Sequence, residues 1–156
     1  MHVIVATDGS KQSLEAARQL KSFADPAKVT EVSVVAVISP LAAVPFANEL
    51  SRPAVTDADD LGGLSFRDEA EAAAGVVVQE FDGWGPRVHQ QVRSGSPATE
   101  LIRMAQELDA DLLVVASGSR GLSETVLLGS TAQRVQHSAP CPVLVSRPRP
   151  GHLASG

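Results

Sequence analysis

The sequence predicts an α/β fold, a doubly wound sheet of five parallel strands with helices on both faces. Short runs rich in β-branched residues alternate with longer segments in which apolar residues recur at helical spacing. Three of the five short runs are almost wholly apolar, as expected for strands that are covered on both faces. Strict alternation of strands and helices predicts right-handed βαβ units, and these leave mostly doubly wound topologies.

The predicted elements follow one another in a regular order. The strands are expected at residues 3–6, 32–38, 87–92, 112–116 and 142–146, and the helices at residues 11–24, 66–81, 97–108 and 130–138. Ser10 and Ser96 precede the first and third helices and are predicted to be their N-caps. Pro97 suits the first position of a helix, and Pro140 ends the last one because proline cannot continue it.

Residues 1–147 are predicted to form one domain, because the chain of 156 residues is long enough to bury one hydrophobic core. Residues 39–65 contain three prolines and the Gly62-Gly63 pair, which predict a long loop. Such a loop is either a lid over a functional site or a solvated connection without function. Residues 148–156 predict a flexible C-terminal tail.

The composition excludes several classes of function. Apolar residues make up 44% of the chain but aromatic residues only 3%, so the core is predicted to be aliphatic. Few aromatic rings and a net charge of −5 argue against binding of nucleic acids, which needs stacking platforms and basic patches. Cys141 is the only cysteine, which rules out an intramolecular disulfide; its apolar setting favours a structural role over a reactive thiol.

The N-terminal segment lacks the basic start and the long apolar run of a signal peptide, and the most apolar stretch is too short to span a bilayer. We therefore expect a cytoplasmic protein without membrane association. The four histidines are scattered without the spacing of metal ligands, and no serine has an assignable catalytic partner. We expect no enzymatic activity.

Asp8 directly follows the first predicted strand. In doubly wound sheets, ligands bind beyond the carboxyl ends of the strands. A carboxylate at this place can accept hydrogen bonds from a ribose or a base amine. The alternative is that Asp8 or Ser10 caps the following helix. The position alone leaves both interpretations open.

A second candidate site is the segment from Ala116 to Gly121, together with Gly129, Ser130 and Thr131. Glycine and serine after a buried strand let backbone N–H groups approach an anion, and the N-terminus of a helix favours negative charge. Glycine-rich turns after strands are common, so this signal is weak by itself. Neither a Walker phosphate loop nor a dinucleotide fingerprint is present.

Taken together, these stretches resemble the universal stress protein family. The residues that carry the resemblance are 3–10, 32–40, 95–102, 110–130 and 139–145. The resemblance implies a Rossmann-like sheet in the order 3-2-1-4-5. It also implies a homodimer paired through the last strand, from Pro142 to Ser146.

Nucleotide-binding members of the family share the pattern Gly-x2-Gly-x9-Gly-Ser/Thr, from which this chain departs. If Gly118 and Gly121 are the first two glycines, only seven residues remain before Gly129. Alignment without gaps restores nine residues but places Ala116 and Ser119 where the glycines belong. We prefer the second alignment because it avoids a frameshift in a buried strand.

By that alignment, the resemblance implies that Asp8 and the backbone of Val37 contact an adenosine. The residues implied around the phosphates are Ala116, Ser119, Gly129, Ser130 and Thr131, and Gly118, the first glycine of the other alignment, is kept as a further candidate. The expected function is a stress-response domain that binds ATP or another adenine nucleotide, with or without Mg²⁺, as a ligand at the carboxyl ends of strands 1, 2 and 4. The alternative is a dimeric interaction module whose phosphate loop has degenerated.

Overall fold

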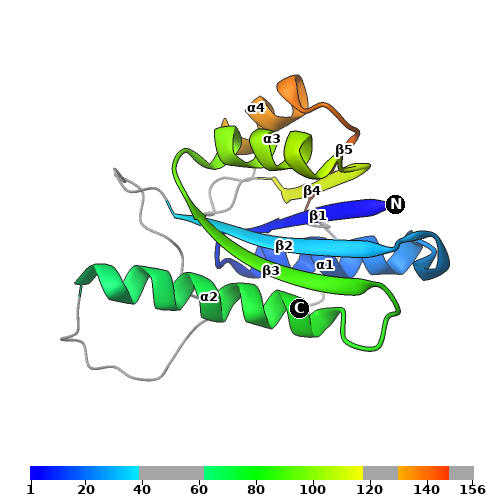
Figure 1. Ribbon diagram of the computed structural model, residues 1–156, viewed down its shortest axis with the longest axis horizontal. Helices are drawn as coiled ribbons and strands as arrows, with labels where there is room; N and C mark the ends of the chain where they lie inside the picture. The colour runs from blue at the N-terminus through cyan, green and yellow to red at the C-terminus, as the bar shows by residue number, and fades with distance from the viewer. Residues whose placement is uncertain (39–61, 118–129, 148–156) are drawn as a thin grey trace, which may run out of the picture.

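The computed structural model describes residues 1–38, 62–117 and 130–147, and in this part of the chain five parallel strands form one sheet (Figure 1). The strand order is β3-β2-β1-β4-β5, which confirms the predicted topology. The strands are β1 (His2–Thr7), β2 (Glu31–Ile38), β3 (Arg87–Ser94), β4 (Leu112–Ala116) and β5 (Val143–Ser146). The helices are α1 (Lys11–Phe23), the short 3₁₀ helix η1 (Pro26–Lys28), α2 (Gly62–Glu80), α3 (Pro97–Leu108) and α4 (Ser130–Ser138).

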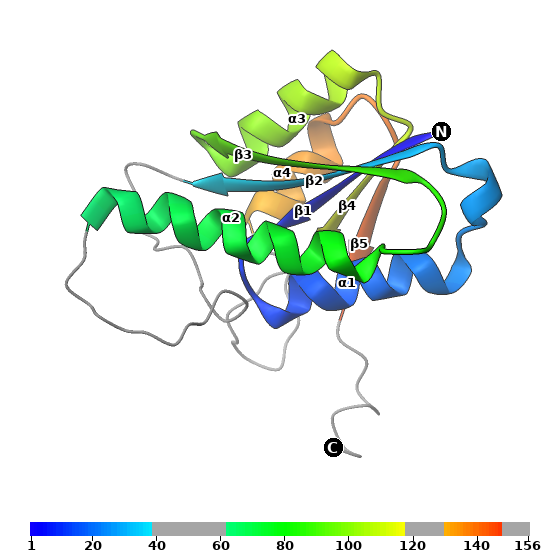
Figure 2. The same cartoon turned by 60° about the horizontal axis from the view of Figure 1, so that its bottom comes forward.

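The helices cover the two faces of the sheet in pairs, α1 and α2 on one face and α3 and α4 on the other (Figure 2). Successive strand residues point to opposite faces, so β1, β2, β4 and β5 contribute to both layers of the core, whereas β3 contributes Val88 and Val92 to the first. The first apolar cluster, beneath α1 and α2, contains Val3, Val5, Ala16, Ala17, Leu20, Val29, Val32, Val34, Ala36, Ala70, Ala74, Val77, Phe81 and Val114. The second apolar cluster, beneath α3 and α4, contains Ile4, Val35, Ala98, Leu101, Met104, Ala105, Leu113, Val115, Ala132 and Val135.

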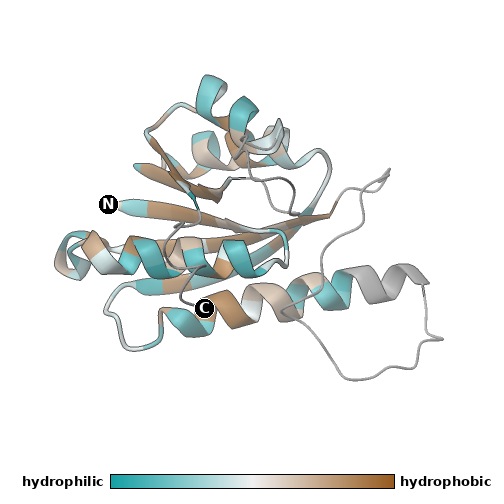
Figure 3. Cartoon of the chain, turned by 180° about the vertical axis from the view of Figure 1, so that it is seen from behind, coloured by the Kyte–Doolittle hydropathy of each residue, from teal (hydrophilic) through white to brown (hydrophobic). Residues whose placement is uncertain are grey.

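The distribution of hydropathy follows these layers. Figure 3 shows hydrophobic strands in the middle and hydrophilic residues on the helices that flank them. Both clusters are almost entirely aliphatic, with Phe81 as the aromatic member. Valine and alanine fill the narrow space between the sheet and the helices packed on it, which accounts for a chain rich in apolar residues and poor in aromatic ones.

Two local predictions need correction. α2 begins at Gly62, so the prediction of a loop over residues 39–65 is wrong for residues 62–65; residues 39–61 lie outside the described part of the chain, as does the predicted tail 148–156. A glycine disfavours a helix by only about 1 kcal/mol relative to alanine, which the rest of a long helix can offset. Ser96 occupies the N-cap position of α3, but its side chain makes no capping hydrogen bond.

Other predicted boundaries agree closely with the structure. Ser10 caps α1, and its Oγ accepts a hydrogen bond from the Ser13 N–H over 3.2 Å. Pro97 opens α3, and α4 ends at Ser138, before Pro140. Among the described residues, none of the helices combines the length and the apolar character needed to cross a bilayer.

Cys141 lies beside the second apolar cluster and is half-buried. Burial raises the pKa of its thiol, and the negative charge of Asp111 raises it further. A raised pKa keeps the thiol protonated at neutral pH, and the protonated form is a poor nucleophile. The partial burial of Cys141 and the raised pKa of its thiol favour the structural role that was predicted from the sequence.

An ion pair at the end of α2 joins the two helices of the first layer. Glu80 accepts hydrogen bonds from Arg18 Nε over 3.1 Å and from Lys21 Nζ over 3.2 Å, both on α1. Burial raises the pKa of the Glu80 carboxyl, but the hydrogen bonds from Arg18 and Lys21 outweigh it, so the pKa is lowered overall. A group with a lowered pKa in the folded state stabilises the fold above its unfolded pKa.

We expect the substitution Glu80→Gln to lower the free energy of unfolding by about 1 kcal/mol at pH 7. The difference from wild type should disappear as the pH falls from the ordinary glutamate pKa of about 4.3 through the lower folded value, because the carboxylate then becomes protonated in the native state. Urea denaturation of the variant and of wild type, at pH 7 and at acidic pH, measures the difference in the free energy of unfolding under each condition. Glu15→Gln is the control, since Glu15 also pairs with Arg18 but its side chain is 60% exposed. If Glu80→Gln lowers the free energy of unfolding by the same amount at both pH values, the prediction is contradicted.

Candidate functional site

The turn after β1 is held by hydrogen bonds between its own side chains and α1. Thr7 is buried, and its Oγ1 lies 2.7 Å from Ser13 Oγ and accepts a hydrogen bond from the Gly9 N–H over 3.1 Å. Gly9 has a φ of 81°, a left-handed conformation that glycine adopts without steric cost. The chain thus turns sharply from the strand into the helix and leaves Asp8 at the edge of the sheet.

Asp8 is exposed, and one of its two carboxylate oxygens is already used. Oδ1 accepts hydrogen bonds from the Ser10 N–H over 3.0 Å and from Ser10 Oγ over 2.5 Å. Ser10, not Asp8, is the N-cap of α1, so Asp8 acts on the helix only by orienting the capping serine. Among the described residues, no hydrogen bond reaches Oδ2. Within residues 1–38, 62–117 and 130–147, this oxygen therefore has no hydrogen-bond donor.

The backbone of Val37 provides a second acceptor at the same edge. The ladder between β1 and β2 ends at Thr7. Ile38 directs its carbonyl to the opposite side, where the Gly95 N–H donates to it over 2.9 Å. Because neighbouring residues of a strand direct their backbone groups to alternate sides, the Val37 carbonyl faces β1. The next N–H in register there, that of Gly9, donates to Thr7 Oγ1 instead, so the Val37 carbonyl lacks this partner.

The tip of β4 brings Ala116 to this edge. Ala116 lies opposite Ser146 of β5, and the next residue, Ser117, donates its N–H to the Ser146 carbonyl over 2.9 Å. Among the described residues, the only one other than glycine with a positive φ is Asp109, so Ala116 has the backbone conformation of an ordinary strand residue. Its methyl group is half-buried and packs against the first apolar cluster.

The beginning of α4 lies toward the same edge. α4 runs back to reach β5 at Val143, which places its first residues, Ser130 and Thr131, near the carboxyl ends of the strands. Ser130 is exposed and Thr131 is half-buried. The structure therefore brings Asp8, Val37 and Ala116 to one edge, with Ser130 and Thr131 beside it. The remaining predicted site residues, Gly118, Ser119 and Gly129, lie outside the described part of the chain.

The turn between β3 and α3, Ser94–Ser96, is one of the strand ends at which the sequence predicted that a ligand could lie, although no site residue was assigned there. Gly95 joins this turn to the tip of β2 through its hydrogen bond to Ile38, and Glu100 packs directly beneath it. The sequence signal for this turn is a glycine at the end of a strand, two residues before Pro97 opens the helix. This turn borders the candidate site on the side of β3.

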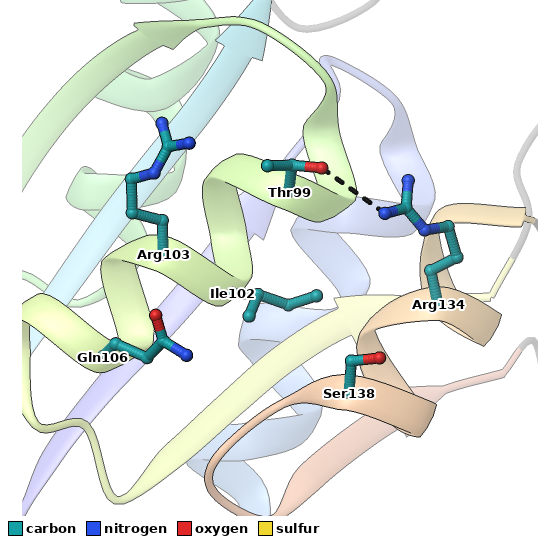
Figure 4. Close-up of a pocket in the computed structure, with 6 residues that line it drawn as sticks. All are labelled: Thr99, Ile102, Arg103, Gln106, Arg134 and Ser138. Atoms are coloured by element: carbon teal, nitrogen blue, oxygen red, sulfur yellow. Dashed lines mark hydrogen bonds between the residues drawn. The ribbon is translucent and has the colours of Figure 1, made fainter.

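A shallow hollow of about 310 Å³ lies elsewhere, between α3 and α4 (Figure 4). Its lining residues are Thr99, Ile102, Arg103, Gln106, Arg134 and Ser138. Arg134 reaches across from α4 and donates a hydrogen bond to Thr99 Oγ1 over 3.4 Å. None of the predicted site residues that the structure describes lines this hollow, so it is separate from the edge described above.

The fold and this edge define an α/β domain whose ligand would lie across the carboxyl ends of its central strands. Residues 1–147 match the model of the universal stress protein family, and the chain belongs to that family. A universal stress protein of Methanocaldococcus jannaschii is 34% identical over 145 residues, which cover 92% of this chain and 79% of the relative.

Solved structures show the same fold. A universal stress protein in complex with cAMP has a TM-score of 0.60 at 22% identity, over 93% of this chain and 95% of the other. A universal stress protein family protein from Arabidopsis thaliana with AMP bound has a TM-score of 0.62 at 17% identity, over 96% of this chain and 92% of the other.

Proposed function

We propose that this universal stress protein domain binds an adenine nucleotide as a ligand at the carboxyl ends of β1, β2 and β4. The observation that carries the proposal is the pair of hydrogen-bond acceptors at this edge, Asp8 Oδ2 and the Val37 carbonyl, on two adjacent strands. The two nucleotide complexes among the structural neighbours, with cAMP and with AMP, support the same class of ligand.

The chemistry of adenosine complements these acceptors. The exocyclic amine of adenine and the ribose hydroxyls are donors, and a carboxylate is the stronger acceptor for them. The half-buried side chain of Val37 offers an aliphatic surface to the base. The phosphates would lie toward Ser130 and Thr131, where the N-terminus of α4 favours negative charge. ATP, with or without Mg²⁺, is the nucleotide that we propose first.

Isothermal titration of the full chain with ATP, AMP and GTP tests this function. We expect ATP and AMP to bind, and GTP to bind about tenfold more weakly or less, because guanine has a carbonyl where adenine has its amine and leaves the protein acceptors unpaired. Absence of heat with ATP and with AMP at millimolar concentration would overturn the proposal. That result would favour the alternative, an interaction module that pairs with a second copy through the edge strand β5.

A further inference from the structure

Glu100 is a buried carboxylate beside the turn between β3 and α3. Glu100 lies on α3 and is 9% exposed. One carboxylate oxygen, Oε1, accepts a hydrogen bond from Arg93 Nε over 3.1 Å. The other, Oε2, accepts one from Arg103 Nη1 over 2.8 Å. Both oxygens are therefore used, and the carboxylate is fixed between two guanidinium groups.

The Arg93 end of this ion pair lies beside Val37, whose carbonyl is one of the two acceptors proposed for adenosine. Arg93 is the partner of Val37 in the ladder between β2 and β3, so the two side chains lie next to each other on the same face of the sheet. Two residues further on, the Gly95 N–H donates to the carbonyl of Ile38. Arg93 and Gly95 thus hold the tip of β2 from the side opposite to β1.

Glu100 also packs closely against the turn between β3 and α3. Gly95 has a φ of 143°, and a methyl group added to it would lie 2.9 Å from Glu100 Oε2. The absence of a side chain at Gly95 is what lets the carboxylate pack beneath the turn. The carboxylate therefore contacts the strand through Arg93 and the turn through Gly95 at the same time.

We propose that Glu100 is a positioning residue for base recognition, which rests on the proposed function. It holds Arg93 and the Gly95 turn so that the carbonyl of Val37 keeps a fixed place at the sheet edge. A buried ion pair contributes little net stability compared with apolar packing, because desolvation of the charges offsets their attraction. Apolar side chains at these positions would not hold Arg93 and the Gly95 turn in one defined geometry, as the ion pair does.

The contacts of Glu100 with Arg93 and with the Gly95 turn lie on the β3 side of the sheet. β3 and β2 lie on one side of β1, whereas β4, which precedes the proposed phosphate segment, lies on the other. Loss of the Glu100 contacts should therefore disturb recognition of the base and leave the phosphate end unchanged. This separation distinguishes positioning of the base from a general loss of folding.

The test compares wild type with Glu100→Gln in the full chain, by titration with ATP, GTP and inorganic triphosphate. We expect the preference for ATP over GTP to fall about tenfold, because small displacements of a contact weaken recognition strongly. Binding of triphosphate should not change. Glu107→Gln is the matched control, because Glu107 pairs with the same Arg93 over 3.2 Å but its side chain is 51% exposed; its preference should equal that of wild type.

Arg93→Gln is a second variant, which removes the Arg93–Glu100 contact from the strand side. It should reduce the preference for ATP over GTP by the same factor. If Glu100→Gln does not fold, Arg93→Gln tests the role of this contact instead. An unchanged preference in the folded variant, or equal losses for ATP, GTP and triphosphate, would overturn the inference while the proposed function stands. If wild type binds neither nucleotide, the proposed function is wrong and the inference falls with it.

Discussion

Replacement of Asp8 by asparagine should abolish binding of adenine nucleotides and leave the fold intact. The side-chain oxygen of asparagine can still accept the hydrogen bond from the Ser10 N–H, so the turn before α1 persists. The amide nitrogen, however, takes the place of Oδ2 and presents donors to the donors of adenosine. A lost hydrogen bond to a charged group and a new donor–donor contact should weaken binding about 100-fold or more, as measured by isothermal titration with ATP.

Two further variants test the reason for this effect. Asp25→Asn is the matched control, because Asp25 makes the same kind of turn, with Oδ1 accepting from the Ala27 N–H over 2.9 Å. Asp25 precedes η1, and its replacement should leave binding unchanged. Asp8→Ala removes both the turn contact and the acceptor, so it should lose binding and also lower the melting temperature. Binding of ATP by Asp8→Asn with the affinity of wild type would contradict the assigned role of the carboxylate.

The substitution Phe81→Ala should cause a large loss of stability. Phe81 is 1% exposed, belongs to the first apolar cluster and contacts the ring of Trp84 with a centroid separation of 5.5 Å. Removal of a fully buried phenyl ring leaves a cavity and lowers the free energy of unfolding by about 3–5 kcal/mol. Native domains have a total free energy of unfolding of only about 5–15 kcal/mol. The midpoint of urea denaturation should therefore be clearly lower in Phe81→Ala than in wild type.

Phe23→Ala provides the control for this prediction. Phe23 ends α1 and is 61% exposed, so its replacement should change the free energy of unfolding by no more than about 0.5 kcal/mol. Comparable losses in the two variants would show that burial in the first apolar cluster does not determine the stability of this domain.

Most of the fold could be predicted because its signals are local. Apolar runs and helical stripes repeat within a few residues, and Pro97 and Pro140 punctuate the chain at helix ends, so the elements and their order agreed with the structure. The error at residues 62–65 arose because the Gly62-Gly63 pair looked like a break. Propensity is a weak signal, and the helix that follows overrides it.

The candidate site could be predicted only in part. Asp8 was found because it directly follows an apolar strand, but the sequence left open whether it binds a ligand or caps α1. The structure shows that Ser10 is the cap and that one oxygen of Asp8 has no hydrogen-bond partner among the described residues. Glu100 gave no signal, because an acidic residue in the first turn of a helix is ordinary and its partner Arg93 lies on a different element.

The sequence by itself determined the class of the fold, the aliphatic character of its core and the edge at which a ligand would lie. Only the tertiary structure decided which polar groups at that edge have no partner in the described part of the chain. The Val37 carbonyl is an example, because its state depends on where the ladder with β1 stops and on the side-chain contact that Thr7 makes with Gly9. Periodicity reports the surroundings of a residue along its own element, whereas a missing hydrogen bond is defined by residues on neighbouring strands.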